Sequence, residues 1–309
     1  MRISDEGIYI EDLSVGFQLP QGKVEVLKDL GIAFKSNQIN GIIGESGSGK
    51  SVLGMAILGI LPPYAEVQGR FVVEGTGYDY GSPEQKKLWG RQVGFIPQNP
   101  QEALNPARKI KAQLMEALTV KYKDRRLRQE KALEMLVNMG FESPEQILKA
   151  YPHELSGGMQ QRALAALSVC CTPQWIIADE PTKGLDAALC QQVAETFKRM
   201  RATGVKGMLV ITHDIHLAKM ICDEIFVMYE GRLVEAGKSV LQKPRHPYSK
   251  ALLGAMPENG MCPIPDKKRE KGTGCIFAER CPACLPICQR QKPSPRIDKD
   301  GFVECFLYE

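Results

Sequence analysis

The stretch INGIIGESGSGKSVLGMAILGIL, residues 39–61, runs from an apolar strand through a glycine-rich turn into a helical segment. Its central part, Gly44–Ser51, has the pattern G-x-x-x-x-G-K-S. Glycines permit the backbone conformations in which successive N–H groups face inward and bind phosphate oxygens. In such a loop Lys50 reaches the β- and γ-phosphates, and Ser51 offers its hydroxyl to Mg²⁺. The stretch therefore predicts a nucleotide phosphate site rather than an ordinary glycine turn.

Unbroken apolar segments elsewhere predict further strands at residues 93–97, 175–179, 207–212 and 224–230. Strands without polar alternation, separated by helical stretches, are typical of a mainly parallel sheet covered on both faces. Residues 8–17 and 24–34 predict two more strands, with loop signals between them. The expected fold class is therefore α/β.

The region 99–155 differs from its surroundings because it is helical and charged and contains no strand candidate. It predicts a helical subdomain over about residues 99–165. Its densest basic run, residues 121–131, contains interspersed acidic residues, which favours a solvated helix face over a nucleic-acid surface. A net charge of +4 is also too small to argue for nucleic acid.

Length and composition indicate how many domains the chain forms and in which compartment it lies. The 309 residues are 43% hydrophobic and 25% charged, which allows one large domain with a small appendage. No apolar run approaches the ~18 residues that a membrane-spanning helix needs. The N-terminus has acidic residues where a signal peptide needs an apolar core. We therefore expect the chain to stay in the compartment where it is made.

Two adjacent carboxylates end the predicted strand WIIAD, residues 175–179. Asp179 at a strand end can hold Mg²⁺, and Glu180, one residue on, is placed to orient or deprotonate a water molecule. Ionised groups at the edge of a core need a cation or a partner, which disfavours an exposed acidic turn. The pair therefore predicts a catalytic edge of the sheet.

A second anion site is indicated by ELSGGMQQR, Glu154–Arg162. Ser156 is a good N-cap, so that Ser156, Gly157 and Gly158 would present donors at the positive end of a helix. Taken alone, the stretch fits an ordinary capped helix equally well. The order of all these motifs decides between the two.

With Gly44–Ser51, LSGGM, IIADEP and ITHD in this order, the chain resembles the ATPase subunits of ABC transporters over about residues 8–236. The resemblance implies a P-loop ABC ATPase fold with an antiparallel β subdomain and a helical subdomain, and ATP and Mg²⁺ as ligands. It implies that the ATP contacts are Phe17, Gly44, Glu45, Ser46, Gly47, Ser48, Gly49, Lys50, Ser51 and Gln98. Phe17 falls where the family stacks an aromatic ring on adenine, although an ordinary core phenylalanine stays possible.

The same resemblance assigns roles in catalysis. Glu180 and His213 would be catalytic, and Ser51, Gln98 and Asp179 would lie at Mg²⁺. Ser156–Gly158 would complete the site of a second subunit in trans, and Asp186 would be the D-loop aspartate. One chain would thus carry one of each half-site, and two ATPase chains would be required.

The tail narrows the family. KPRHPYSKALLGAMP, Lys243–Pro257, is similar to the segment that follows the ATPase domain in oligopeptide, dipeptide and nickel importers. The change to a Pro-rich and then cysteine-rich sequence predicts a separate C-terminal module over residues 237–309, joined by a short linker and containing a charged stretch at 265–272. The resemblance implies an ATPase that powers import of peptides, nickel or a related solute, peripheral on the cytoplasmic face of the membrane. Its partners would be a second identical or related ATPase subunit, two membrane-spanning permease subunits and a solute-binding protein, with no nucleic acid.

A competing hypothesis is a soluble ABC ATPase that carries an iron–sulfur module and acts on nucleic acid or ribosomes. Such proteins generally have two cassettes or a long coiled-coil insertion, and this sequence has neither. A nucleotide kinase is disfavoured by the LSGGM stretch. The solute itself is left open, because the substrate path lies in other chains.

The tail also holds a group of cysteines, with Cys275, Cys281 and Cys288 followed by Cys305. Ten cysteines in a reducing compartment argue against a disulfide framework. This short segment has almost no apolar core of its own. A metal bound by four thiolates could take the place of that core, because the free energy of metal binding stabilises the folded segment. The spacing, and the resemblance to importers whose tails hold a cluster, favour a 4Fe-4S cluster over zinc or no metal. Cys262 and Cys284 lie outside the expected pattern and receive no role.

Overall fold

The computed structural model of the chain describes residues 6–262 and 274–309. The chain divides into two compact units. The first comprises residues 1–34, 40–80 and 222–309, and the second comprises residues 35–39 and 81–221. The charged stretch at 265–272 lies outside the described residues, since all of it falls within residues 263–273.

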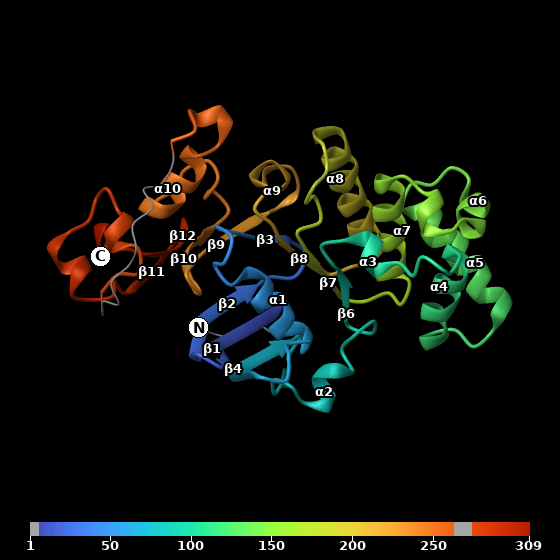
Figure 1. Ribbon diagram of the computed structural model, residues 1–309, viewed down its shortest axis with the longest axis horizontal. Coiled ribbons are helices and arrows are strands. Elements are labelled where there is room, and N and C mark those ends of the chain that lie inside the picture. Colours follow the sequence, from blue (N-terminus) through green and yellow to red (C-terminus); the bar gives the residue numbers. More distant parts are fainter. Residues whose placement is uncertain (1–5, 263–273) are drawn as a thin grey trace. The chain divides into compact units, whose positions relative to one another are not determined.

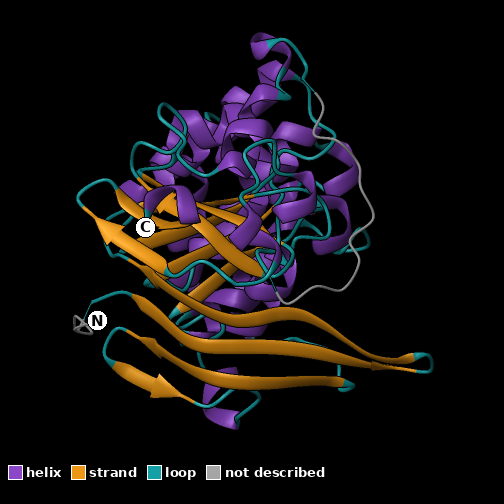
Figure 2. Cartoon of the chain, turned by 90° about the vertical axis from the view of Figure 1, so that its left-hand side faces the viewer, coloured by secondary structure: helices purple, strands orange, loops and turns teal. Residues whose placement is uncertain are grey.

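The first unit contains an antiparallel sheet of four strands, visible as long ribbons in Figures 1 and 2. They are β1 (Ile8–Leu19), β2 (Gly22–Phe34), β4 (Ala65–Val73) and β5 (Thr76–Tyr78), in the order β2-β1-β4-β5. The predicted strands at 8–17 and 24–34 are confirmed, and both extend into the loop because Leu19 pairs with Gly22 across a tight hairpin.

The other strands of the first unit follow the order β11-β12-β10-β9-β3. They are β3 (Ile39–Ile43), β9 (Glu224–Tyr229), β10 (Arg232–Gly237), β11 (Pro295–Asp298) and β12 (Gly301–Glu304). Among these strands β3 and β9 pair in parallel, as expected, whereas β10, β11 and β12, for which no strand was predicted, pair antiparallel. The reason is that β9–β10 and β11–β12 are joined by two-residue turns, whereas parallel neighbours need a long crossover.

The second unit carries the parallel strands β6 (Val93–Ile96), β7 (Trp175–Asp179) and β8 (Gly207–Ile211), in the order β8-β7-β6. These confirm the predicted strands at 93–97, 175–179 and 207–212. Helices α7 (Gly157–Val169), α8 (Ala187–Ala202) and α9 (Ile215–Ile221) belong to the same unit. All five residues of β8 are buried, which explains why the strand sequences lack polar alternation.

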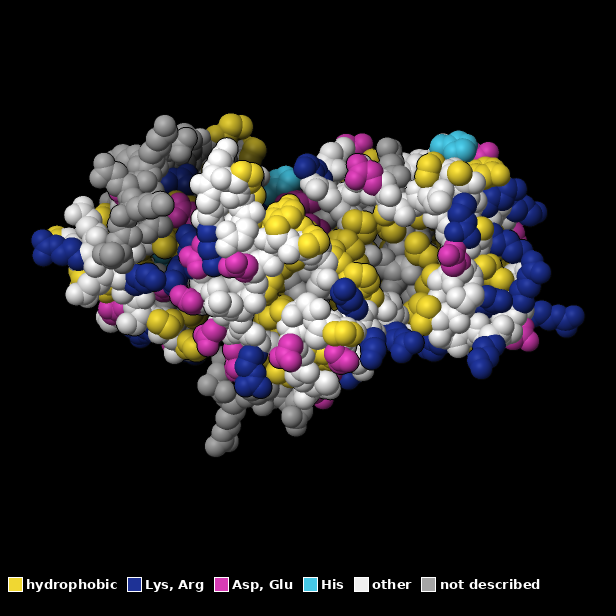
Figure 3. Space-filling view, turned by 60° about the horizontal axis from the view of Figure 1, so that its bottom comes forward, with side chains coloured by type: hydrophobic (Ala, Val, Ile, Leu, Met, Phe, Trp, Pro, Cys, Tyr) yellow, Lys and Arg dark blue, Asp and Glu magenta, His cyan; other side chains and the backbone are white. Residues whose placement is uncertain are grey.

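The segment 99–155 is described throughout and contains only helices, as predicted. Helices α4 (Ile110–Ala117), α5 (Arg125–Asn138) and α6 (Pro144–Lys149) gather together in Figure 1, with the short α2 (Pro83–Lys86) and α3 (Pro100–Ala103) before them. Asp124 caps α5 by accepting hydrogen bonds from Arg126 N and Leu127 N. Many Lys and Arg side chains of this segment are exposed, and dark-blue side chains gather at the right-hand end of Figure 3, in agreement with a solvated helix face.

The predicted C-terminal module belongs to the same compact unit as the antiparallel sheet. Strand β12 extends β10 by antiparallel pairing, with Glu235 opposite Val303. The loop before it buries Phe277, which is 1% exposed. The ring centroid of Phe277 lies 5.3 Å from that of Tyr229 on β9 and 5.4 Å from that of Tyr248 on α10 (Pro247–Gly254). The tail therefore shares an aromatic core with the ATPase strands.

This packing predicts that Phe277→Ala lowers the free energy of unfolding by about 3–5 kcal/mol, the usual cost of emptying a buried phenylalanine site. Denaturant titration of the full chain measures it. Ile297→Ala is the matched control, because Ile297 lies in the same tail and is 71% exposed. If Phe277→Ala lowered the free energy of unfolding as little as Ile297→Ala does, the result would contradict the shared core.

Candidate functional site

The loop Gly44–Ser51 joins β3 to α1 (Lys50–Leu58), as the sequence predicts. Gly44 has φ 156° and lies so close to β9 that a Cβ atom there would be 2.2 Å from the carbonyl oxygen of Met228. Gly47 and Gly49 have φ values of 82° and 97°, in the region that favours glycine. These positions allow the loop to curl tightly at the start of the helix.

Lys50 is held inside this loop. Its Nζ donates to the carbonyl oxygens of Gly44, at 2.8 Å, and Glu45, at 2.9 Å. The Lys50 Nζ is also 3.4 Å from Ser48 Oγ, and the residue is only 6% exposed. The ammonium group therefore lies at the centre of the loop, where a phosphate would meet it.

Other parts of the first unit support the loop from outside. The turn between β9 and β10 donates a hydrogen bond from Gly231 N to Ser48 O at 3.0 Å. A Cβ atom on Gly231 would lie 2.0 Å from Val26 O, so only glycine fits this close approach. The hydroxyl of Tyr248 accepts a hydrogen bond from Glu45 N at 2.8 Å.

Phe17 is partly exposed on β1 rather than part of the core. Its ring centroid lies 6.0 Å from that of Tyr64, which is 55% exposed. The position therefore disfavours the core alternative and leaves aromatic surface for a planar ligand.

In the second unit, the end of β7 carries Asp179 and Glu180. Glu180 N donates to Ile211 O of β8 at 2.8 Å, and Glu180 itself has φ 48°, an uncommon conformation for a residue other than glycine. Its Oε2 lies 2.6 Å from His213 Nδ1. The structure thus brings together the two residues predicted to be catalytic.

Gln98 and Asp179 belong to neighbouring strands of this unit. Gln98 follows β6 by two residues, and Ile96 of β6 is in register with Ala178 of β7. The carboxyl ends of parallel strands meet at one edge, so Gln98 and the carboxylates of Asp179 and Glu180 lie at the same edge.

The predicted helix start at Ser156 is present. Ser156 Oγ accepts from Met159 N at 3.4 Å and caps α7. A Cβ atom on Gly158 would lie 2.8 Å from Gln192 Oε1 of α8, whereas Gly157 has open space. Asp186 caps α8, with Leu189 N donating to its Oδ1 at 2.9 Å. Both helix starts are therefore fixed by side-chain caps.

Comparison with known proteins decides what this arrangement is. Residues 27–183 match the family model described as ABC transporter, and residues 234–288 match that of the oligopeptide/dipeptide transporter C-terminal region. This chain belongs to the ABC transporter ATPases. It is an ATP-binding subunit and hydrolyses ATP.

Relatives and solved structures support the family over nearly the whole chain. The chain is 35% identical to the dipeptide transport ATP-binding protein DppD of Bacillus subtilis, covering 97% of this chain and 94% of that protein. It is 33% identical to the oligopeptide transport ATP-binding protein OppD of Escherichia coli, covering 98% and 94%. A dimeric structure of MJ0796, a bacterial ABC transporter cassette, is 26% identical with a TM-score of 0.64 and covers 77% of this chain and 99% of that one.

The side chains predicted to lie at Mg²⁺ have suitable chemistry. Ser51 of the first unit offers a hydroxyl oxygen, and Asp179 and Gln98 of the second unit offer carboxylate and amide oxygens, the ligand types that Mg²⁺ prefers. Mg²⁺ is usually held by one or two carboxylates together with substrate phosphates and water. A site of this kind needs no preformed cage of protein ligands.

The predicted tail metal is not supported. Among residues 6–262 and 274–309, no group of three or more His, Cys, Asp or Glu could hold a metal ion. This finding supports neither the 4Fe-4S cluster nor the zinc alternative at Cys275, Cys281, Cys288 and Cys305. The expectation assumed that the segment lacks an apolar core, but Phe277 supplies one together with Tyr229 and Tyr248.

Two of the four tail thiols, those of Cys288 and Cys305, are buried, and those of Cys275 and Cys281 are half-buried. Cys288 and Cys305 are 7% and 8% exposed, and burial raises the pKa of the Cys275 thiol to about 11. A neutral buried thiol behaves as a small apolar side chain, whereas metal binding requires the thiolate. The environment of Cys275 therefore favours the neutral thiol.

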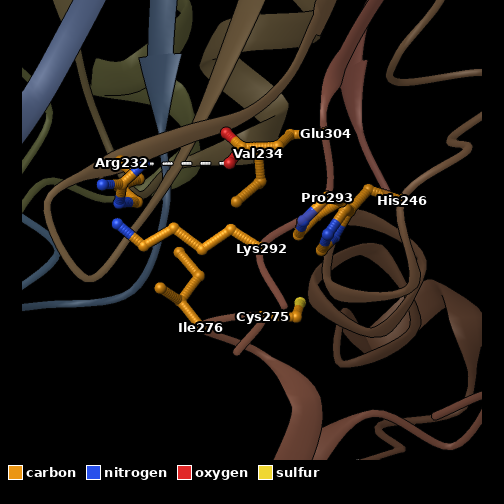
Figure 4. A pocket seen from close by; sticks show the side chains of 8 residues that line it. All are labelled: Arg232, Val234, His246, Cys275, Ile276, Lys292, Pro293 and Glu304. Carbon is orange, nitrogen blue, oxygen red and sulfur yellow. Dashed lines mark ion pairs between the residues drawn. The ribbon is translucent and has the colours of Figure 1, made fainter. Parts of the chain in front are cut away.

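A small cavity next to Cys275 is no ligand site either. It has a volume of about 10 Å³ and is lined by Arg232, Val234, His246, Cys275, Ile276, Lys292, Pro293 and Glu304 (Figure 4). This is about the space of one water molecule. Arg232 Nη1 lies 3.8 Å from Glu304 Oε1 across it.

Two site contacts were not foreseen in the sequence. Tyr248 lies in the recognised stretch Lys243–Pro257, but nothing in the stretch indicates a contact with the phosphate loop. Arg280 forms an ion pair with Glu45 from 235 residues away, and no local pattern marks it.

None of the helices in residues 6–262 and 274–309 has the length and apolar character that a membrane span requires.

Proposed function

We propose that this ABC ATPase powers the import of peptides through membrane-spanning permease subunits. The observation that carries the proposal is the oligopeptide/dipeptide transporter C-terminal region at residues 234–288, which follows the ATPase motifs in the same chain. Relatives named for dipeptide and oligopeptide transport support it. Neither the family models nor these relatives favour nickel as the solute.

The chemistry we propose follows from the positions of the side chains. Lys50 and the backbone N–H groups of Gly44–Ser51 hold the phosphates of ATP, and Phe17 stacks on the adenine ring. Ser51, Gln98 and Asp179 would hold Mg²⁺, which when bound would neutralise phosphate charge. Glu180 orients the attacking water, and His213 fixes the Glu180 carboxylate through the 2.6 Å contact. Phosphoryl transfer depends mainly on such positioning.

The proposed assembly contains two ATPase subunits. Ser156, Gly157 and Gly158 present donors at the start of α7, and we propose that they contact ATP held by a second identical or related chain. Asp186 lies at the start of α8, the helix that packs against Gly158. Two permease subunits and a solute-binding protein complete the complex, with the ATPases peripheral on the cytoplasmic face and no nucleic acid. The soluble iron–sulfur alternative finds no support in the relatives.

Purification with the permease subunits and the solute-binding protein tests this function. The isolated chain should hydrolyse ATP slowly, and assembly should raise the rate, because Ser156–Gly158 can complete only a partner's site. Peptides should stimulate the assembled complex, whereas nickel salts should not. Stimulation by RNA or ribosomes without any response to peptides would overturn the proposal.

A further inference from the structure

Glu45, the second residue of the phosphate loop, is held from the C-terminal tail. Arg280 Nη1 lies 2.9 Å from Glu45 Oε2, and Arg280 Nη2 lies 2.9 Å from Glu45 Oε1. Such a bidentate pair fixes the orientation of the carboxylate as well as its distance. Tyr248 holds the backbone of the same residue by accepting its N–H.

Arg280 is itself fixed in place. It ends the short helix Ala278–Arg280, directly after the buried Phe277. Its Nη1 lies 3.3 Å from Tyr229 Oη, and its Cζ lies 5.7 Å from the centroid of the Tyr229 ring. The side chain is only 15% exposed, so that solvent screens the pair with Glu45 less than it screens a surface ion pair.

The contact reaches the phosphate-binding lysine through a single residue. Glu45 accepts from Lys50 Nζ with its backbone oxygen and from Arg280 with its carboxylate. A carboxylate at this position would repel the phosphates of ATP if nothing neutralised it. The hydrogen bonds to Glu45 raise the pKa of Arg280, so its charge persists throughout the working pH range.

We propose that Arg280 is a positioning residue for nucleotide binding, which holds the start of the phosphate loop and neutralises Glu45. The tail thereby sets the affinity of the chain for ATP without touching the nucleotide. This inference rests on ATP binding by the loop and is independent of which solute is transported.

A double-mutant cycle in the full chain tests the inference. The variants are Arg280→Ala, Glu45→Gln and the combination, and the measurement is the Kd of a fluorescent ATP analogue with Mg²⁺, together with kcat and KM. Arg280→Ala should raise Kd and KM roughly three- to tenfold through the unpaired carboxylate, with a much smaller change in kcat. In the Glu45→Gln background the same substitution should change Kd less than about twofold.

Two further variants separate this role from a purely structural one. Arg296→Ala is the matched control, because Arg296 lies in the same tail and pairs with Asp298 instead. It should leave Kd unchanged. Arg280→Lys keeps the charge and the stem of the side chain, so it should fold even if Arg280→Ala does not, and its Kd should lie between the wild-type and alanine values.

Two results would overturn the inference. If Arg280→Ala raises Kd by the same factor with Glu45 and with Gln at position 45, the effect does not pass through the carboxylate. If neither Arg280→Ala nor Arg280→Lys changes Kd, the ion pair does not influence the loop. Failure of the wild-type chain to bind ATP would instead contradict the ATPase function itself.

Discussion

Glu180→Gln should leave ATP binding intact and lower kcat by roughly 10²- to 10⁴-fold, the range that a positioned general base contributes. The amide keeps the shape of the side chain but loses its charge and its ability to accept a proton. The expected result is a protein that holds ATP in a stable closed dimer. Steady-state ATPase assays and equilibrium nucleotide binding measure the two effects separately.

The geometry explains why the effect should be large. Glu180 has an uncommon backbone conformation, its Oε2 lies 2.6 Å from His213 Nδ1, and its side chain is 12% exposed. Glu195→Gln is the matched control, since Glu195 is an exposed residue of α8 that pairs with Lys198. Wild-type turnover in Glu180→Gln would remove this residue from the mechanism.

Lys50→Ala should weaken ATP binding by roughly 10- to 100-fold, because charge-assisted hydrogen bonds contribute about 1.5–3 kcal/mol each. Lys50 contacts phosphates that are already charged in the bound ground state. Its loss should therefore raise Kd, which titration with ATP measures. Lys198→Ala, which removes an exposed lysine of α8, should leave Kd unchanged.

His213→Ala provides the contrast within the same site. His213 contacts Glu180, and we expect its role to arise when the water attacks. Its removal should spare ATP affinity and lower turnover. Equal losses of ATP affinity in the Lys50 and His213 variants would contradict this division of roles.

Much of the fold could be predicted because its signals are local. The strands β6, β7 and β8 are apolar runs bounded by helices, and their limits agree with the predictions to within one residue. The outer strands of the first unit could not be predicted in the same way. Apolar character indicates that a strand is buried, but it does not indicate whether the neighbouring strand is parallel or antiparallel.

The tail shows the limit of a local argument. Four cysteines in a loop-rich segment suggested a metal centre, because the segment has few apolar residues of its own. The missing core comes from Tyr229 and Tyr248, which lie outside the cysteine-rich stretch. Packing against residues outside the segment depends on where the chain folds back. The spacing of the cysteines does not indicate it.

The phosphate loop, the capped helix at Ser156 and the carboxylates after β7 could be predicted from short stretches of sequence, because glycine conformation, N-capping and strand ends depend on neighbouring residues. The contact of His213 with Glu180 and the ion pair of Arg280 with Glu45 became visible in the folded chain alone. These contacts join residues 33 and 235 positions apart. Their existence depends on the packing of distant segments, since the attraction between two charges is set by their separation in space and not by their separation along the chain.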